Sequence, residues 1–316
     1  MHILINGWFW GQATTGSGQY LHRLVEHLAR IETGARFTVL TPEKRDWRTE
    51  NGDWGADVPI PVLRSPIPSL PRPLAKLYWE QITVPVTARR LGADLLFVPY
   101  WAAPLWQPIP TVVTVHDLIP LLLPIYRGGL LNRLYTNLVC LTARRAAAVI
   151  TVSQAGAQDV TTHLHVPPQR VSAIHHGSNV EIRPQATAKK LAAIRAKYAL
   201  PERYFLYLGG FDARKNVEGI LAGYRRYLDK GGDPTVKLAL AGKLPGVDTP
   251  FFPDPRRMAA ALNLTDHIHY AGWVDEDDKP QLYAGATAYL FPSHYEGFGM
   301  MLLEAMAAGC PVITSG

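Results

Sequence analysis

Short apolar runs alternate with amphipathic stretches along the whole chain, and this alternation limits the fold more than any other feature of the sequence. Apolar runs bounded by turn residues indicate buried strands, and apolar residues spaced three or four apart indicate helices. In the first half, strands are expected at residues 2–6, 37–41, 58–63, 95–99, 111–115 and 148–152, and helices at 18–31, 73–91, 130–146 and 154–164. Strands that alternate with helices in this way predict parallel sheets in an α/β protein.

The same alternation continues in the second half, after a break near residue 179. Strands are expected there at residues 204–208, 236–241, 267–270, 288–291 and 312–314, and helices at 216–229, 255–262, 276–284 and 299–308. The break is a turn followed by a polar, Lys-rich stretch, so we expect two α/β domains, over residues 1–178 and 179–316. The chain ends just after an expected buried strand. Because one face of that strand would lack a covering helix, we expect the second domain to be incomplete at its C-terminus.

The composition fits a soluble two-domain protein. The chain has 316 residues, of which 47% are hydrophobic and 18% charged, which is enough for two buried cores. Cys140 and Cys310 are the only cysteines, so no disulfide framework is available and a reducing compartment is expected. The N-terminus lacks a basic leader, and no apolar stretch is long enough to span a bilayer. These features predict a cytoplasmic protein.

Positive charge is concentrated in the first half of the chain. Residues 1–180 contain 16 Lys and Arg against 11 Asp and Glu, whereas residues 181–316 contain 16 against 15. The segment between Asp117 and Asp159 has no acidic residue, and it contains Arg127, Arg133, Arg144, Arg145, Leu130, Leu131 and Leu134. A basic, partly apolar face suits peripheral contact with an anionic membrane, or an anionic acceptor, and a solvated helix with surplus arginine is the alternative. No aromatic-interleaved basic platform is present, so nucleic acid is not expected as a partner.

The strongest motif lies between an expected strand and an expected helix near the end of the chain. It reads Glu296-Gly297-Phe298-Gly299-Met300-Met301-Leu302-Leu303-Glu304. A loop after a parallel strand lies at the carboxyl edge of the sheet, where ligands bind, and the N–H groups of the next helix favour phosphate. Ionised Glu296 and Glu304 only accept hydrogen bonds, so they suit the hydroxyl groups of a sugar and a ribose. The motif predicts a nucleotide-sugar site, and an ordinary strand–turn–helix with surface glutamates is the alternative.

A second motif occupies the equivalent place after the first strand of the second half. Arg214 and Lys215 stand at the expected start of the helix at 216–229, where the positive end of the helix dipole disfavours cations. Two cations in that place suit an anion such as a diphosphate, because arginine offers a bidentate fork and lysine a point charge. Exposed surface cations are the alternative interpretation.

One histidine is a further candidate, and no metal is expected. His116 follows the expected strand at 111–115, so it too should lie at the carboxyl edge of a sheet. The acidic run Asp275–Asp278 precedes a helical pattern, where Asp275 is better interpreted as a helix cap than as a metal ligand. The histidine pairs at 163 and 165 and at 267 and 269 lack further ligands at a convincing spacing.

Together these motifs resemble one family. They are the glutamates 296 and 304 with seven residues between them, the Arg214-Lys215-Asn216 turn, Val115-His116-Asp117, and Gly16-Ser17-Gly18 opening a helix. The chain resembles, over nearly its whole length, the retaining nucleotide-sugar glycosyltransferases of family 4, the group 1 glycosyltransferases. The resemblance implies the GT-B fold, in which two Rossmann-like domains with parallel sheets face a central cleft. It also implies that the family pattern continues beyond Gly316, so the chain would be truncated at its C-terminus.

The resemblance assigns roles to individual residues. Glu296 would contact the hydroxyl groups of the donor sugar, Glu304 the ribose, and Arg214 with Lys215 the diphosphate. His116 would approach the transferred sugar and join Arg214, Lys215 and Glu296 in catalysis. Donor binding would further involve Gly16, Ser17, Gly18, Gly297, Phe298, Gly299, Met300 and Met301. Many family members carry an arginine where this chain has Gly210, so here Arg214 would supply the guanidinium.

These expectations define an enzyme and its partners. It would transfer a hexose, such as mannose or glucose, from a nucleoside diphosphate sugar to a hydroxyl with retention of configuration. The nucleotide sugar would be a co-substrate, and no cofactor or metal is expected. The acceptor would be a glycan or a lipid-linked sugar in polysaccharide biosynthesis, met at the inner face of the cell membrane. The alternatives are a nucleotide-sugar epimerase of the same architecture and a non-catalytic module that binds sugar nucleotides or membranes.

Overall fold

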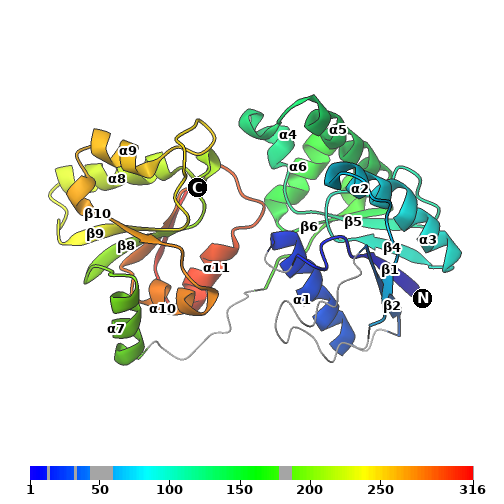
Figure 1. Cartoon of the computed structure of the whole chain (residues 1–316), viewed down its shortest axis with the longest axis horizontal. Coiled ribbons are helices and arrows are strands. Elements are labelled where there is room, and N and C mark those ends of the chain that lie inside the picture. Colours follow the sequence, from blue (N-terminus) through cyan, green and yellow to red (C-terminus); the bar gives the residue numbers. More distant parts are fainter. Residues whose placement is uncertain (13–14, 32–33, 43–59, 178–186, 316) are drawn as a thin grey trace. The chain divides into compact units, whose positions relative to one another are not determined.

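The computed structural model describes residues 1–12, 15–31, 34–42, 60–177 and 187–315. The chain divides into two compact units, Met1–His175 and His176–Gly316, and each is built on one parallel sheet (Figure 1). The boundary predicted between residues 178 and 179 lies outside the described residues. The expected α/β class with parallel sheets is confirmed.

The first unit has seven strands in the order β3-β2-β1-β4-β5-β6-β7, and all of their pairings are parallel. The strands are β1 (His2–Asn6), β2 (Arg36–Thr41), β3 (Val62–Arg64), β4 (Leu95–Val98), β5 (Thr111–Val115), β6 (Ala148–Thr151) and β7 (Val171–Ala173). The helices are α1 (Gly16–Arg30), α2 (Arg72–Tyr78), the π-helix η2 (Trp79–Thr83), α3 (Val84–Arg90), α4 (Ile119–Leu122), α5 (Leu130–Arg145) and α6 (Gln154–Leu164). Short 3₁₀ turns occur at η3 (Pro124–Tyr126) and η4 (Pro168–Arg170).

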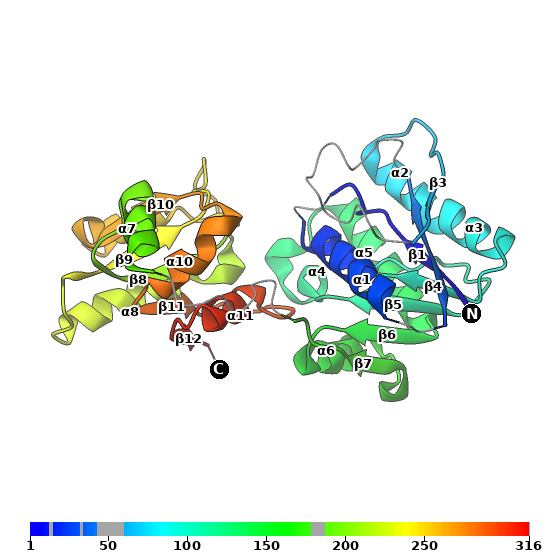
Figure 2. The ribbon, with the colours of Figure 1, turned by 90° about the horizontal axis from the view of Figure 1, so that it is seen from below.

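Alternate side chains of each strand enter two separate cores, as expected for a sheet covered on both faces. Ile5 of β1 packs with Leu21 and Val25, so α1 covers one face. Leu4 belongs to the other core, together with residues of α2, η2, α3, α5 and α6. At the end of the sheet, α6 lies beside β7 (Figure 2).

The second unit has five parallel strands in the order β10-β9-β8-β11-β12. The strands are β8 (Arg203–Leu208), β9 (Val236–Ala241), β10 (Ile268–Gly272), β11 (Ala288–Phe291) and β12 (Val312–Thr314). The helices are α7 (Ala188–Lys197), α8 (Val217–Asp229), α9 (Pro255–Ala261), α10 (Lys279–Ala284) and α11 (Met300–Ala307), with 3₁₀ turns η5 (Ala213–Lys215), η6 (Thr265–His267) and η7 (Glu276–Asp278). Leu206 and Tyr289 pack with α7, α10 and α11 on one face, and Leu238 and Leu240 pack with α8 and α9 on the other.

The structure differs from expectation in several elements. The helix expected at 73–91 is interrupted by η2, because Pro85 has no N–H to donate and the Val84 N–H instead bonds to Trp79 O, five residues back. The short edge strand β7 was not expected, and neither was α7, which buries only Ile194 and so shows little apolar periodicity. The strand expected at 58–63 lies partly outside the described residues, and β3 begins at Val62.

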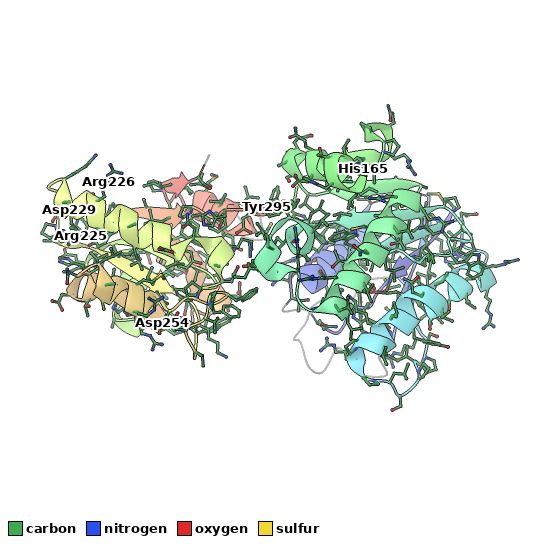
Figure 3. The ribbon with its side chains drawn as sticks, turned by 90° about the horizontal axis from the view of Figure 1, so that it is seen from above. His165, Arg225, Arg226, Asp229, Asp254 and Tyr295 are labelled. Atoms are coloured by element: carbon green, nitrogen blue, oxygen red, sulfur yellow. The ribbon has the colours of Figure 1, made fainter. Side chains whose placement is uncertain are left out.

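Surface charges of the second unit are often paired with charges nearby in the chain. On α8, Arg225 and Asp229 approach to 2.7 Å, and at the start of α9, Asp254 and Arg256 also approach to 2.7 Å. Arg225, Asp229 and Asp254 are labelled in Figure 3. Exposed pairs of this kind contribute about 1 kcal/mol or less to stability.

Candidate active site

The loops after β8 and β11 meet at one point of the second sheet. These strands are neighbours, and the chain runs from β8 through β9 to β10 on one side while β11 and β12 lie on the other. The reversal makes the crevice beyond their carboxyl ends the topological switch point, where open α/β sheets bind ligands. Both motifs predicted from the sequence lie in these two loops.

The loop after β8 does not lead directly into α8. Arg214 and Lys215 belong to the separate turn η5, and the left-handed residue Asn216 (φ 54°) then caps α8. The Asn216 side chain accepts from Gly219 N at 3.1 Å and donates to Pro292 O at 3.0 Å, so it ties the two loops together. Both cations therefore lie immediately before α8, and the αL residue turns the chain between them and the helix.

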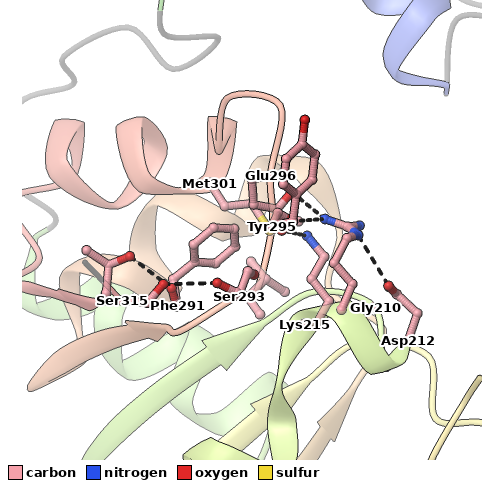
Figure 4. Close-up of polar contacts among 12 residues, drawn as sticks. Gly210, Asp212, Lys215, Phe291, Ser293, Tyr295, Glu296, Met301 and Ser315 are labelled. Carbon is pink, nitrogen blue, oxygen red and sulfur yellow. Dashed lines mark hydrogen bonds and ion pairs between the residues drawn. The ribbon is translucent and has the colours of Figure 1, made fainter. Parts of the chain in front are cut away.

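Arg214, Lys215 and Glu296 form one charged cluster. Arg214 Nη1 lies 2.5 Å from one carboxylate oxygen of Glu296, and Lys215 Nζ lies 2.7 Å from the other (Figure 4). Arg214 is also fixed by Asp212, whose Oδ1 lies 3.5 Å from its Nε, and by the carbonyl of Tyr295 at 3.1 Å. The cluster thus joins two loops that are about 80 residues apart in the chain.

The ionisation of Glu296 follows from this pairing. Burial alone would raise the pKa of Glu296, but Lys215 and Arg214 outweigh it and hold the pKa below its ordinary value. The side chains of Arg214 and Lys215 are only 13% and 12% exposed. Two largely desolvated cations that share Glu296 suit a bound anion that can displace this carboxylate.

The loop after β11 ends at Gly299, which has a φ of 92° that glycine adopts without strain. Gly297 and Phe298 precede it, and Phe298 packs edge-on against His176 with ring centroids 5.1 Å apart. Met300 and Met301 begin α11, and the Met301 sulfur accepts a hydrogen bond from Tyr289 OH at 3.5 Å.

Glu304, one turn further along α11, has a different environment from Glu296. It is 7% exposed, and its carboxylate accepts a hydrogen bond from Tyr283 OH of α10 at 3.3 Å. Burial raises its pKa above the ordinary value. The structure thus brings Glu296, and not Glu304, into contact with Arg214 and Lys215. Sequence reasoning missed Tyr283, whose position within a helix gives no signal, and Asp212, whose place two residues before Arg214 could have suggested it.

In the first unit, His116 lies directly after β5, as expected. Its Nε2 is 3.0 Å from Pro99 O, and its ring packs edge-on against Tyr20 of α1 with centroids 4.8 Å apart. Burial lowers the pKa of His116, so a neutral imidazole is favoured near pH 7. Tyr20 was not predicted from the sequence, because its contact with His116 depends on the packing of α1.

Gly16, Ser17 and Gly18 form the first turn of α1, which begins two residues earlier than expected. Thr15 caps the helix, and its hydroxyl accepts from Gly18 N at 3.1 Å. A Cβ added to Gly18 would lie 2.0 Å from Gln12 O, so only glycine fits there. The close approach of α1 to the preceding loop explains this glycine without a ligand.

Within the described ranges, no group of three or more His, Cys, Asp or Glu side chains is arranged to hold a metal ion. In the acidic run that was weighed as a metal motif, Asp275 and Asp278 pair with Lys197 at 2.8 and 2.6 Å. Asp275 therefore binds Lys197 with its side chain and does not cap the helix through it.

The chain has two α/β units, each built on a parallel sheet, and one of them has a cation–carboxylate cluster at its switch point. This architecture matches that of the GT-B glycosyltransferases. The chain belongs to glycosyltransferase family 4: the sequence profile described as Glycosyltransferase Family 4 matches residues 14–182. The profile described as Glycosyl transferases group 1 matches residues 192–316.

Similar proteins include three bacterial mannosyltransferases. O-antigen chain mannosyltransferase B of Escherichia coli is 29% identical over 65% of this chain and 52% of its own length. O-antigen chain mannosyltransferase RfbU of Salmonella typhimurium is 24% identical over 96% of this chain and 79% of its own length. The match to the serotype-specific mannosyltransferase WbdA of Escherichia coli spans only 25% of that protein. The chain thus spans between a quarter and about half of several of these relatives.

Solved structures agree on the fold. The Anabaena protein Alr3699/HepE, solved with UDP and glucose, aligns with a TM-score of 0.67 at 19% identity over all of this chain and 81% of its own. WaaG, a glycosyltransferase involved in lipopolysaccharide biosynthesis, aligns with a TM-score of 0.61 at 17% identity over 99% of this chain and 80% of its own. At these identities the likeness establishes the GT-B fold alone.

The cluster predicts that two matched substitutions change the stability of the protein by different amounts. Glu296→Gln leaves Lys215 without its carboxylate and Arg214 with Asp212 alone, so we expect it to lower the free energy of unfolding by about 2–4 kcal/mol at pH 7. This loss should shrink as the pH falls through the lowered pKa of Glu296, since protonation removes the same charge. Lys279, the cation that acts on Glu304, keeps Glu276 as its partner, so Glu304→Gln should change stability by about 1 kcal/mol or less, or raise it. Urea unfolding at pH 4 and 7 measures both, and equal losses at pH 7 would contradict the assignment.

Proposed function

We propose that the protein transfers a hexose from a nucleoside diphosphate sugar to a hydroxyl group, with retention of configuration, in the assembly of a cell-surface glycan. The observation that carries this proposal is the convergence of Arg214, Lys215 and Glu296 at the switch point of the second unit. It supplies paired cations for a diphosphate beside a carboxylate that accepts hydrogen bonds from sugar hydroxyls.

The relatives support the nature of the donor and of the product. The matched O-antigen enzymes are named as mannosyltransferases, and Alr3699/HepE was solved with UDP and glucose and also with UDP-glucose. These names are consistent with a nucleoside diphosphate hexose as the donor and with a polysaccharide as the product.

In our proposed mechanism, Glu296 stays paired with Arg214 and Lys215 until the donor binds. The diphosphate would compete with the carboxylate for Arg214 and Lys215, and the freed Glu296 would accept hydrogen bonds from the sugar. The same two cations would then stabilise the charge that develops on the departing nucleoside diphosphate. They would supply the positive charge that a metal ion provides in other transferases, so we propose that no metal is needed.

The pairing of Glu296 also bears on retention. A carboxylate that lies within 2.7 Å of two cations, and whose pKa is lowered, is a weak nucleophile. We therefore propose a front-face displacement, in which the leaving phosphate helps to deprotonate the acceptor hydroxyl. His116, kept neutral by burial, would contact the transferred sugar as a hydrogen-bonding group, without carrying a charge.

We further propose that the first unit contacts an anionic membrane surface. Leu130, Leu131 and Leu134 of α5 are 72%, 81% and 55% exposed, on the side of the helix opposite the buried Val139 and Ala143. Arg133 lies in the same turns of α5 as these leucines, and Arg144 and Arg145 lie in the last turn of the helix, about 15 Å further along its axis. No helix in the described ranges is long and apolar enough to cross a bilayer, so the contact would be peripheral.

The charge of the surrounding surface supports this contact. Residues 60–158, all described, contain nine Lys and Arg and three Asp and Glu, so their net charge of +6 equals that of the whole chain. Of the three acids, Glu80 is fully buried, Asp94 accepts from His2 N, and Asp117 accepts from Ile119 N. A basic surface with protruding leucines has the chemistry of an interfacial membrane site.

The donor site is tested by thermal unfolding with a panel of nucleoside diphosphate hexoses. We expect one donor to stabilise the protein by about 3 kcal/mol at 100 times its Kd. Glu304→Gln should abolish this stabilisation, whereas Glu202→Gln, at an exposed position just before β8, should keep it. Mass analysis of the products then separates transfer to an acceptor from epimerisation of the donor. Absence of stabilisation by every donor would contradict the proposed function.

The membrane contact is tested by sedimentation with vesicles. The vesicles contain about 30% phosphatidylglycerol, which gives them a negative surface charge. We expect the protein to bind these vesicles, and to bind vesicles of phosphatidylcholine alone about tenfold more weakly. Replacing Leu130, Leu131 and Leu134 by serine should reduce binding about tenfold. Val247→Ser, at a 73% exposed position of the second unit, should leave binding unchanged. If the triple leucine variant and the parent bound the vesicles equally well, this part of the proposal would be contradicted.

A further inference from the structure

A second Lys–Glu pair lies in the core of the first unit. Glu80, in the π-helix η2, is 0% exposed, and Tyr135 of α5 donates its hydroxyl to the two carboxylate oxygens at 2.9 and 3.1 Å. Lys76, one turn earlier on α2, places its Nζ 3.5 Å from Glu80 Oε1. Tyr100 also hydrogen-bonds with this carboxylate. None of these residues belongs to the site described above, and π-helical turns are frequent at functional sites.

The pair is anchored at the switch point of the first sheet. Tyr100, just after β4, accepts from Asn6 Nδ2 at 2.9 Å, and Asn6 is the last residue of β1. The strands β1 and β4 are neighbours, with β2 and β3 on one side and β5 to β7 on the other. Asn6 Oδ1 also accepts from Trp79 Nε1 at 2.8 Å, which links β1 to η2. The network therefore lies where an open α/β sheet receives a ligand.

Lys76 is the member of this network that reaches the surface. Its side chain is 27% exposed, and its ammonium lies 5.7, 5.5 and 5.0 Å from the ring centres of Phe9, Tyr100 and Tyr135. In the described part of the chain, Glu80 is its one charged partner. Three rings and one carboxylate fix the ammonium in place, yet a lysine has three N–H groups to donate. Donors of Lys76 thus remain for a ligand.

The surroundings of Lys76 favour an anion as that ligand. Arg72 precedes it by one helical turn, and Arg72 Nη2 donates to Gln12 Oε1 at 2.8 Å. Phe9 and Gln12 belong to the same segment between β1 and α1, so Arg72 and Lys76 face one loop. Within residues 60–158, Glu80 is fully buried, and the other two carboxylates each bind a backbone N–H. Neither Asp94 nor Asp117 pairs with Arg72 or Lys76 in the structure, so these two cations suit a phosphate or a sulfate.

We propose that Lys76, with Arg72 beside it, binds an anionic group of the acceptor at the switch point of the first unit, and that Glu80 is the positioning residue that sets its orientation. This inference rests on the proposed function only in naming the ligand as the acceptor. The acceptor class it implies is a sugar that carries a phosphate or a similar ester close to the hydroxyl that reacts. Glu80 is too deeply buried to touch the acceptor itself.

Glu80 would also make this binding depend on pH. Burial raises the pKa of Glu80 to about 7, although Lys76 and the two tyrosines act against the rise. Burial also raises the pKa of Tyr100 and of Tyr135, so both phenols stay protonated and keep donating. Above pH 7 the ionised Glu80 offsets the charge of Lys76, and below pH 7 that charge is unopposed. Anion affinity should therefore fall as the pH rises through 7.

The test uses glucose 6-sulfate, which keeps a single charge throughout this range, with uncharged glucose as the comparison. Calorimetric titration of the full chain at pH 6 should give a Kd for the sulfate that Lys76→Met weakens about tenfold. The matched change at an exposed lysine of the other unit, Lys230→Met, should alter the Kd about twofold or less. A loss in Lys230→Met equal to or larger than that in Lys76→Met, or binding of glucose as tight as that of its sulfate, would overturn the proposal.

Two further variants separate binding from folding. Lys76→Met strands the buried Glu80, so the double variant Lys76→Met/Glu80→Gln restores neutrality and should show the same weakened Kd while unfolding cooperatively. In the parent, the Kd should weaken about fivefold from pH 6 to pH 8, and Glu80→Gln should remove this dependence. A parent Kd that is the same at both pH values would refute the role of Glu80. Because no donor is present, a failure here leaves the donor test of the second unit unaffected.

Discussion

The contact of Arg214 and Lys215 with Glu296 is the interaction on which the second unit's site depends. It joins loops that follow β8 and β11, which are adjacent in the sheet although they are far apart in the chain. In this parallel sheet the reversal in strand order makes β8 and β11 neighbours, so their two loops meet at one point. The pairing keeps two largely buried cations compensated until an anion can replace the carboxylate, so the site is both stable and prepared for its ligand.

Both units place a Lys–Glu pair at the switch point of their sheets, yet the pKa values of the two glutamates shift in opposite directions. Glu296 contacts two cations and keeps some exposure, so its pKa is lowered. Glu80 has one cation and no exposure, so burial dominates and raises its pKa to about 7. The count of cations and the depth of burial therefore decide which carboxylate stays ionised. This difference suits a permanent anion site in one unit and a pH-dependent one in the other.

Much of the fold followed from the sequence, because strand and helix periodicities are local and parallel order follows from their alternation. The sequence also predicted that Arg214, Lys215 and Glu296 lie at one sheet edge, since each follows a buried strand. It did not predict the αL turn at Asn216, which detaches both cations from α8. It gave no signal for Glu80 either. Lys76 and Glu80 have the spacing of an exposed helical pair, and only Tyr135, 55 residues away, reveals the burial.

The role of Arg214 in stabilising the leaving diphosphate is tested most directly by single-turnover kinetics with the donor that the thermal panel identifies. In Arg214→Ala, Lys215 still pairs with Glu296, so the fold of the site should survive. We expect the rate of sugar transfer to fall about 100-fold or more while the donor Kd weakens about tenfold or less, because the arginine acts mainly on charge that develops during transfer. Equal losses in the rate and in the affinity would mean that Arg214 only binds the donor, and would contradict this account.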